Sequence, residues 1–155
     1  MTPAVALAKK TGIQFTLHEY DHDPTIRSYG QEAAQKLGVA PGQLFKTLVI
    51  STDSSGLAVG VVPVSSQLDL KAIAKAFGVK KTTMAEKVLV ERATGYITGG
   101  VSPMGQKKQL PTIIDASALD FDIVFVSAGR RGLQISLSPG DLASLTRAEF
   151  HRISK

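Results

Sequence analysis

The chain has 155 residues, of which 43% are hydrophobic and 20% are charged, a balance typical of a globular protein with one core. It carries a net charge of +5 and contains no cysteine, which excludes disulfides, thiolate metal sites and a cysteine nucleophile. No apolar stretch approaches the roughly 18 residues that span a bilayer, and the first residues do not resemble a signal peptide, so we expect a cytoplasmic protein without membrane contact.

The excess of cations is partly arranged in adjacent pairs. These pairs are Lys9–Lys10, Lys80–Lys81, Lys107–Lys108 and Arg130–Arg131. A basic balance of this kind fits a polyanionic partner such as RNA. Paired cations can also simply keep loops and helix ends solvated, so charge alone leaves both interpretations open.

The first third of the chain predicts two short helices, a strand and a hairpin. Thr2–Pro3 caps a helix that ends at Gly12, since threonine accepts at a helix start and glycine adopts the left-handed end. Further predicted elements, in chain order, are a strand over 13–20, a helix over 31–37 that ends at Gly38, and strands over 44–51 and 57–64 joined by a polar turn at 52–56.

The remaining elements alternate helices with short strands. Asp69 caps a helix over 70–77, and Thr83 with Glu86 has capping-box spacing, which predicts a helix over about 84–92. The later predicted elements are a strand over 112–115, a hairpin of 121–127 with 133–137, a helix from Ser138–Pro139 to about 145, and an edge strand over 150–153. This order favours an α+β (mixed α/β) fold whose largely antiparallel, barrel-like curled sheet is surrounded by short helices, in a single domain over 1–155.

The segment from Gly95 to Lys108 has the strongest chemical signature. It combines four glycines, one proline and a lysine pair within 14 residues. Such a loop can aim peptide N–H groups at an oxygen atom, with cations at its far end for a phosphate. Paired glycines such as Gly99–Gly100 also occur in ordinary tight turns, so a purely structural loop is the alternative.

Lys46 is the second candidate, because it interrupts an apolar predicted strand. Burying a lysine is costly unless it is paired or has a task. It is either an edge-strand lysine whose ammonium reaches water, or a cation at the mouth of a pocket that holds a phosphate or a developing oxyanion.

Several common chemistries find no support in the sequence. The GxGxxG, GxxxxGK[ST] and GxSxG patterns are absent, which disfavours dinucleotides, ATP or GTP, and a conventional serine hydrolase. His18 and His22 look like metal ligands, but on a strand they lie roughly 13 Å apart, too far for shared ligation. The turn from Ser127 to Gly132 is either a plain hairpin turn or a pocket edge whose two arginines bind phosphate.

Seven short segments occur in an order that resembles a known family. They are Thr2-Pro3-Ala4, Tyr20-Asp21-His22-Asp23, Glu32-Ala33-Ala34, Phe45-Lys46-Thr47-Leu48, Gly95-Tyr96, the run from Gly99 to Lys108, and the run from Val126 to Leu133. The chain resembles the bacterial YbaK-type Cys-tRNA(Pro) deacylases, which are related to the editing domain of prolyl-tRNA synthetase. Ala128 stands where the family pattern has glycine, and Gln134 stands where some relatives carry an acidic residue, so no acidic role is assigned there.

The resemblance implies an enzyme that clears cysteine mischarged on proline tRNA. In the family picture the substrate's own thiol attacks its ester carbonyl, which gives a cyclic thiolactone and free tRNA without metal or organic cofactor. The alternatives are a deacylase for another mischarged tRNA such as Ala-tRNA(Pro), attack by a bound water, and a non-catalytic tRNA- or synthetase-binding module.

The resemblance also implies roles for residues. Lys46 would hold the terminal adenosine phosphate or ribose, and the N–H groups of Gly99 and Gly100 would face the ester carbonyl. The implied substrate-binding residues are Tyr20, Thr47, Ser127 and Gly129, and the implied tRNA contacts are Lys107, Lys108, Arg130 and Arg131. The implied partners are mischarged tRNA(Pro) and prolyl-tRNA synthetase in a tRNA-dependent complex, with no DNA.

Overall fold

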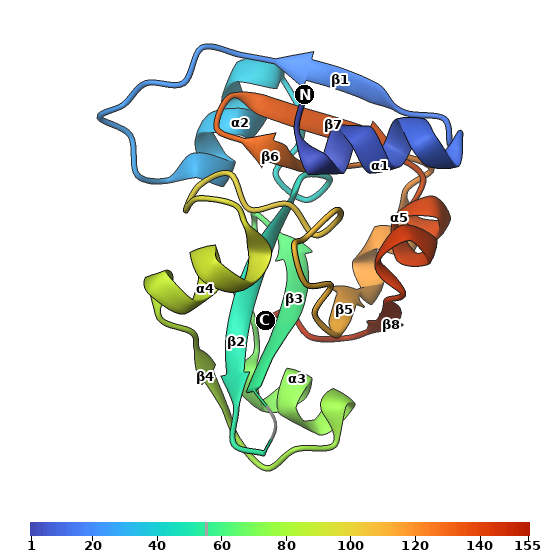
Figure 1. Ribbon diagram of the computed structural model, residues 1–155. Helices are drawn as coiled ribbons and strands as arrows, with labels where there is room; N and C mark the ends of the chain where they lie inside the picture. Colours follow the sequence, from blue (N-terminus) through green and yellow to red (C-terminus); the bar gives the residue numbers. More distant parts are fainter. Residues whose placement is uncertain (55) are drawn as a thin grey trace.

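The computed structural model describes residues 1–54 and 56–155 and has an α+β architecture (Figure 1). Within those residues the helices are α1 (Pro3–Thr11), α2 (Tyr29–Leu37), α3 (Leu70–Phe77), α4 (Lys87–Thr94), α5 (Pro139–Thr146) and the 3₁₀ helix η1 (Ala116–Asp120). The strands are β1 (Thr16–Glu19), β2 (Phe45–Thr52), β3 (Gly56–Pro63), β4 (Thr82–Met84), β5 (Thr112–Asp115), β6 (Val124–Arg130), β7 (Leu133–Leu137) and β8 (Glu149–His151). Ser55, in the predicted turn at 52–56, lies outside the described residues.

The strands form two sheets. The larger has the order β4-β2-β3-β5-β8, with antiparallel pairs at its β4 end and parallel pairs from β3 to β8. The smaller has the order β1-β7-β6 and is antiparallel throughout. The α+β prediction is therefore confirmed, whereas the barrel-like curl is not, because the described strands close no barrel.

Local capping signals placed three helices correctly. The Thr2 hydroxyl accepts from Val5 N–H at 3.2 Å at the start of α1, and Asp69 accepts from the N–H groups of Lys71 and Ala72 at 3.1 Å each at the start of α3. Ser138 caps α5 in the same way. These predictions succeed because donor and acceptor lie within one turn of each other.

The helix predicted over 84–92 is wrong at its start. Residues Thr82–Met84 form β4, which pairs with Ile50–Thr52 of β2, and α4 begins at Lys87. Glu86 precedes α4 without a side-chain capping bond. Pairing with an exposed strand edge has outweighed the local capping-box pattern, since strand preference depends on the neighbours available.

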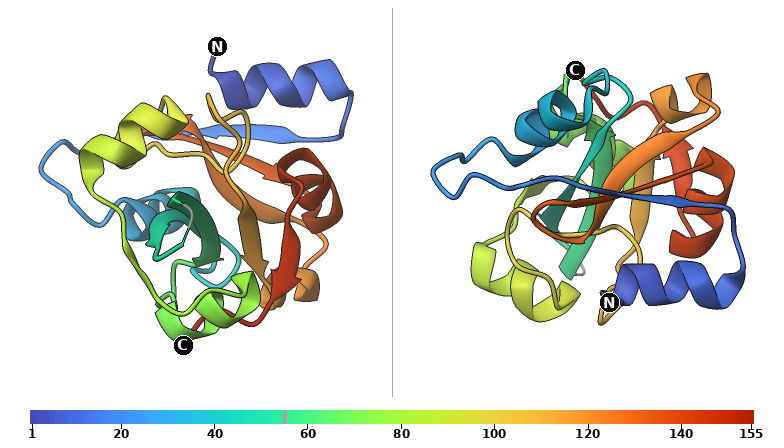
Figure 2. Two further views of the ribbon diagram at one scale, coloured as in Figure 1. Left: turned by 60° about the horizontal axis from the view of Figure 1, so that its bottom comes forward. Right: turned by 90° about the horizontal axis from the view of Figure 1, so that it is seen from above.

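The core lies between the sheets and under the helices. Its largest cluster joins α1, β2, β3, β6 and β7, with Phe45, Val59 and Ile135 among its buried side chains. The left view in Figure 2 shows α1 and α3 at opposite ends of the molecule, with the N-terminus near α1 and the C-terminus near α3. No helix among the described residues has the length and apolar character that crossing a membrane requires.

The two sheets meet at the start of β2 and then separate. Leu44 forms a parallel bridge with Phe125, and Phe125 N–H donates to Gln43. On the same edge of β2, β4 pairs from Ile50 onward, and Ala85 N–H donates to Val49. Between these points no described strand pairs with residues 45–48 on the edge opposite β3. We call this stretch the open edge of β2.

Asp115 fixes the C-terminal segment to the larger sheet. Its buried carboxylate accepts from the N–H groups of Ile153 at 2.9 Å, Ser154 at 3.0 Å and Ser117 at 3.3 Å. Burial alone would raise the pKa of Asp115, but hydrogen bonds from Ser117 and Ile153 outweigh it and hold the pKa below its ordinary value.

Replacing Asp115 with alanine should lower the free energy of unfolding by about 2–3 kcal/mol, because buried N–H donors lose a charged acceptor. Urea denaturation measures the change, and Asp122→Ala at an exposed position is the control, with an effect below about 0.5 kcal/mol. The stabilisation that the Asp115 carboxylate gives to the folded state is fully present above the ordinary Asp pKa. It is lost as the pH falls through the lowered pKa that Asp115 has in the folded protein. Equal losses for both variants would contradict the assignment.

Candidate active site

The open edge of β2 forms one wall of a cavity of about 510 Å³. The other walls come from the start of α2, the residues on either side of the start of α4, the glycine segment, and strands β6 and β7. Five residues predicted from sequence line this one cavity: Tyr20, Lys46, Thr47, Gly99 and Ser127. The fold thus brings together residues that are up to 107 positions apart, Tyr20 and Ser127 being the most distant.

Lys46 is one of two lysines that line the cavity. It is half-buried on β2, and burial lowers the pKa of its ammonium group. It has no acidic partner in the described part of the chain. Lys87 at the start of α4 lines the same cavity, and the described lining residues include no aspartate or glutamate. This arrangement favours an anionic ligand.

Two polar atoms near Lys46 also have no partner in the described residues. They are Thr47 Oγ1 and Gln134 Oε1, which are both buried and belong to residues that line the cavity. Buried polar atoms are nearly always hydrogen-bonded in folded proteins. Burial also raises the pKa of the neighbouring Tyr20 hydroxyl, which stays neutral. The wall of the cavity therefore contains polar side chains whose hydrogen-bonding capacity is not fully used within the described residues.

The glycine pair lies against the turn between β6 and β7. A Cβ at Gly100 would lie 2.8 Å from Arg130 Cα, and a Cβ at Gly99 would lie 2.7 Å from Arg131 Nε. Gly99 also has a φ of +88°, a conformation that favours glycine. Protein backbone and side chains, rather than a ligand, occupy the space that the missing side chains leave.

One predicted backbone donor is already used. The N–H of Gly100 donates to Ile97 O at 2.9 Å, so it does not face a substrate in this structure, which corrects the prediction for that atom. The N–H groups of Gly99 and Val101 have no acceptor in the described residues, and both residues line the cavity. The N–H groups of this loop that border the cavity without an acceptor are therefore those of Gly99 and Val101.

The rest of the glycine segment is held rigidly by its own side chains. Tyr96 Oη donates to Met104 O at 2.8 Å, and burial raises the pKa of Tyr96 to about 12. Gln106 Nε2 donates to Ser102 O at 3.1 Å, while its Oε1 accepts from Leu110 N–H at 3.2 Å. These bonds fix the loop before any ligand arrives.

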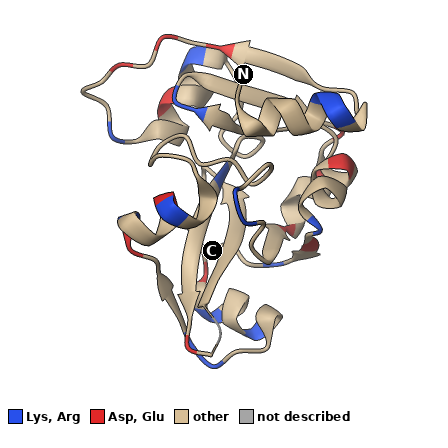
Figure 3. Cartoon of the chain, viewed as in Figure 1, with Lys and Arg blue, Asp and Glu red and all other residues tan. Residues whose placement is uncertain are grey.

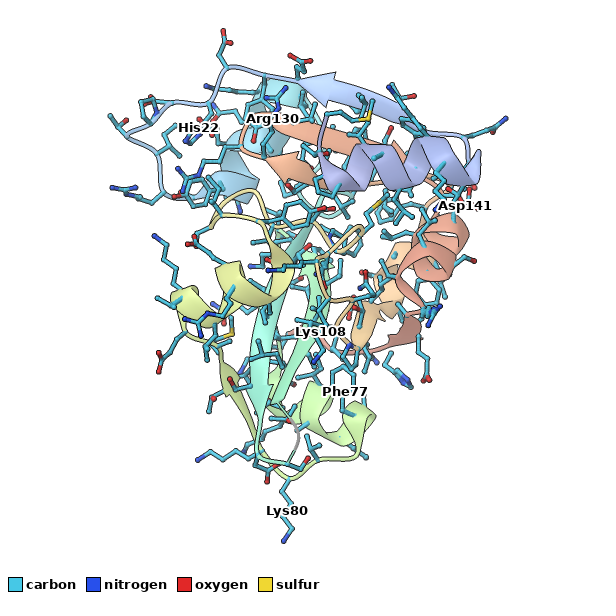
Figure 4. All side chains as sticks on the ribbon, in the orientation of Figure 1. His22, Phe77, Lys80, Lys108, Arg130 and Asp141 are labelled. Carbon is cyan, nitrogen blue, oxygen red and sulfur yellow. The ribbon has the colours of Figure 1, made fainter. Side chains whose placement is uncertain are left out.

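Other predicted site residues lie outside the cavity lining. Gly129 packs toward Thr2 and Tyr96, and its N–H donates to Ser127 Oγ at 3.2 Å. Lys108 lines a second cavity of about 620 Å³, together with Phe77 and Leu110, and Figure 4 shows it well apart from Arg130 at the end of β6. The exposed residues of this group are Lys107, Lys108 and Arg130, whereas Arg131 is half-buried.

Among the lining residues to which the sequence analysis gave no role are Tyr29, Lys87, Thr98 and Gln134. Tyr29 and Lys87 each begin a helix, and no sequence pattern marks which way such a residue faces. Thr98 directly precedes the glycine pair, so its position was the one available signal. Gln134 was treated only as a departure from the family pattern.

The two histidines that resembled metal ligands have separate partners. His18 Nε2 lies 2.8 Å from Ser136 Oγ, and His22 Nδ1 lies 2.6 Å from Glu32 Oε1. Among the described residues no group of three or more histidine, aspartate or glutamate side chains is placed to hold a metal ion. The His22–Glu32 pair instead ties the segment before α2 to that helix.

Comparisons with known proteins agree with these motifs. The aminoacyl-tRNA editing domain family matches residues 23–145. EbsC of Enterococcus faecalis, which bears the name of a candidate Cys-tRNA(Pro)/Cys-tRNA(Cys) deacylase, is 44% identical over 124 residues, covering 80% of this chain and 76% of EbsC. A hypothetical protein of known structure has a TM-score of 0.88 at 25% identity over 99% of both chains. A candidate trans-editing enzyme for prolyl-tRNA synthetase shares the fold, with a TM-score of 0.86 at 24% identity over 100% of this chain and 99% of that one.

Replacing Gly100 with alanine should lower the free energy of unfolding by about 1–3 kcal/mol, because the added methyl group would press on the Arg130 backbone. Chemical denaturation of the purified variant measures this loss. Gly140→Ala is the matched control, since a Cβ there meets no atom within 4 Å. If both variants are as stable as the parent chain, the two turns are not in firm contact.

Proposed function

This chain belongs to the aminoacyl-tRNA editing domain family, and from that membership we propose that it removes cysteine from mischarged proline tRNA. It is a trans-editing aminoacyl-tRNA deacylase whose substrate is a charged tRNA. Cysteine and proline have similar volumes, so packing alone separates them poorly in a synthetase pocket. A second site that cleaves the wrong ester restores accuracy.

One observation carries the proposed mechanism. The described lining of the cavity contains no histidine, carboxylate or cysteine, so its hydroxyl groups have none of the usual partners that activate a serine or threonine nucleophile. An aminoacyl ester is already activated, and a substrate thiol held near its own carbonyl attacks at high effective concentration. The substrate's sulfur then bonds to the carbonyl carbon and the bond to the ribose oxygen breaks. The thiol proton ends on that oxygen, which leaves a cyclic thiolactone and intact tRNA.

The cavity residues fit complementary roles in this step. Lys46 holds the phosphate or ribose of the terminal adenosine, aided by its unpaired charge. The unpartnered N–H groups of Gly99 and Val101 stabilise the oxyanion that develops on the ester carbonyl. Tyr20, Thr47 and Ser127 contact the aminoacyl group, with the unpartnered Thr47 hydroxyl accepting or donating there.

The tRNA contacts outside the cavity are proposed to be few. Lys107, Lys108 and Arg130 are exposed cations, and Figure 3 shows basic residues spread over several elements rather than gathered on one. Such a dispersed charge gives modest, salt-sensitive binding. We infer that prolyl-tRNA synthetase completes recognition in a tRNA-dependent complex in the cytoplasm. Loss of synthetase capture when tRNA is omitted from a pull-down tests this partner.

Replacing Lys46 with alanine should lower the rate of cysteine release from Cys-tRNA(Pro) by about 100- to 1,000-fold, the usual effect of removing one stabilising group from an active site. Release of labelled amino acid measures the rate, with Lys75→Ala on the remote helix α3 as the control. Ala-tRNA(Pro) is assayed in parallel. Release of alanine instead of cysteine would change the substrate, and tRNA binding without release of either would indicate a binding module.

Blocking the substrate thiol separates the two possible attacking groups. S-methylcysteinyl-tRNA(Pro) should resist cleavage, because its sulfur can no longer lose a proton and close the ring. We expect its rate to fall at least about 100-fold below that of Cys-tRNA(Pro), the advantage of an intramolecular nucleophile. Comparable rates for the two substrates would instead show that water attacks.

A further inference from the structure

The residue just before the glycine pair is held from both sides by charged side chains. Glu91 of α4 accepts through Oε2 from Thr98 N–H at 3.0 Å and from Thr98 Oγ1 at 3.3 Å. From the opposite side, Arg131 donates through Nε to Thr98 O at 2.9 Å. Both backbone polar groups of Thr98 are thus bonded to ionised side chains, and such bonds are about twice as strong as neutral ones.

We propose that Arg131 and Glu91 are positioning residues that act through Thr98 to set the N–H of Gly99 against the substrate carbonyl. This inference rests on the proposed deacylase function. Neither side chain lines the cavity, whereas Thr98 and Gly99 both do. Catalysis by fixed N–H donors requires that the donors be aligned before the substrate binds.

Arg131 also connects the glycine segment to α2. Its guanidinium carbon lies 4.8 Å from the centre of the Tyr29 ring, which lines the cavity. A Cβ at Gly99 would lie 2.7 Å from Arg131 Nε and 3.0 Å from two carbons of that ring. Gly99 is therefore seated on the Arg131–Tyr29 stack, which explains why a side chain is excluded there.

Beyond Tyr29, the contacts continue through His22 to the buried carboxylate of Glu32. The His22 ring lies 5.7 Å from Tyr29, and His22 Nδ1 lies 2.6 Å from Glu32 Oε1. Glu32 also accepts from Asp23 N–H at 2.8 Å and pairs with Lys36 at 3.3 Å. A connected set of contacts, which we call the clamp, thus runs from Glu91 of α4 through Thr98 and Arg131 to Tyr29 of α2.

The Glu91 carboxylate of the clamp stays ionised. The hydrogen bond from Thr98 N–H lowers the pKa of Glu91, and nearby Lys87 and Arg131 lower it further. The carboxylate therefore remains an acceptor at neutral pH and below.

Arg130 provides a natural comparison within the same turn. Its side chain is exposed, and its ion pair with Glu19 spans 3.8 Å between exposed groups, a geometry worth little in water. A lysine at either position keeps the positive charge that a phosphate needs, but it lacks the Nε donor and the flat surface that stacks on Tyr29. The two conservative substitutions therefore separate positioning from tRNA attraction.

The test compares Arg131→Lys with Arg130→Lys in single-turnover deacylation of Cys-tRNA(Pro), with tRNA affinity measured separately. Arg131→Lys should slow the chemical step about 100-fold, the effect of misplacing a reacting group by about 1 Å, while tRNA affinity stays within about twofold. Arg130→Lys keeps the charge of a proposed tRNA contact, so comparison with it shows whether a loss comes from weaker tRNA attraction. Arg152→Lys, at an exposed position near the C-terminus, should keep the parent rate. An unchanged rate for Arg131→Lys, or a loss confined to tRNA affinity, would overturn the proposal.

The other side of the clamp gives an independent variant. Glu91→Ala should slow the same step, Glu91→Gln should restore part of the rate because its amide oxygen still accepts from Thr98, and Glu86→Ala at the exposed start of α4 should have no effect. Equal rates for Glu91→Ala and Glu91→Gln would count against positioning through Thr98.

Amide hydrogen exchange separates this inference from the proposed function. In Arg131→Lys the N–H of Gly100, which bonds to Ile97 O, should exchange faster than in the parent chain, with α3 unchanged. If the parent chain cleaves none of the charged tRNAs but this difference is seen, the deacylase assignment fails and the clamp stands. If exchange is unchanged, the clamp fails whatever the activity.

Discussion

The close approach of two turns is the constraint on which this structure depends. The Gly99–Gly100 backbone and the Arg130–Arg131 backbone come so near that no side chain fits between them. One turn follows α4, which packs beside the larger sheet, and the other joins two strands of the smaller sheet. Their contact closes the space that opens where β2 and β6 separate. The cavity is therefore a product of sheet arrangement, and the glycines are needed for packing.

Unsatisfied polar groups distinguish this cavity from the core beneath it. Lys46 has no acidic partner, and Thr47 Oγ1 and Gln134 Oε1 have no hydrogen-bond partner among the described residues. Each of these groups lowers the stability of the free protein, since burial removes water without replacing its bonds. A ligand that supplies an anion and matching donors or acceptors relieves that cost. The same groups that weaken the free fold thus favour binding.

Capping patterns within a few residues predicted helix starts well, and they failed where pairing with a distant strand determines the structure. Thr2, Asp69 and Ser138 mark helix starts because each bonds within its own turn. Thr83 and Glu86 carry an equally good capping pattern, yet Thr83 pairs with Ser51 across the sheet. The parallel alignment of β3, β5 and β8 likewise depends on crossovers that no short pattern encodes. For the site, family resemblance named Lys46, Thr47 and Ser127, which line one cavity in the structure. The hydrogen bond of the Gly100 N–H and the contacts of Arg131 follow only from three-dimensional packing.

The open edge of β2 has a consequence for how this protein behaves among other copies of itself. A strand edge with unpaired backbone groups can recruit a strand from another molecule and begin aggregation. Here the unpaired stretch spans only residues 45–48, because the bridge to β6 lies before it and the pairing with β4 follows it. A stretch of four residues in the wall of a cavity is shorter than the roughly five to six residues of an ordinary strand. The backbone is thus open to a small ligand group and closed to a neighbouring chain.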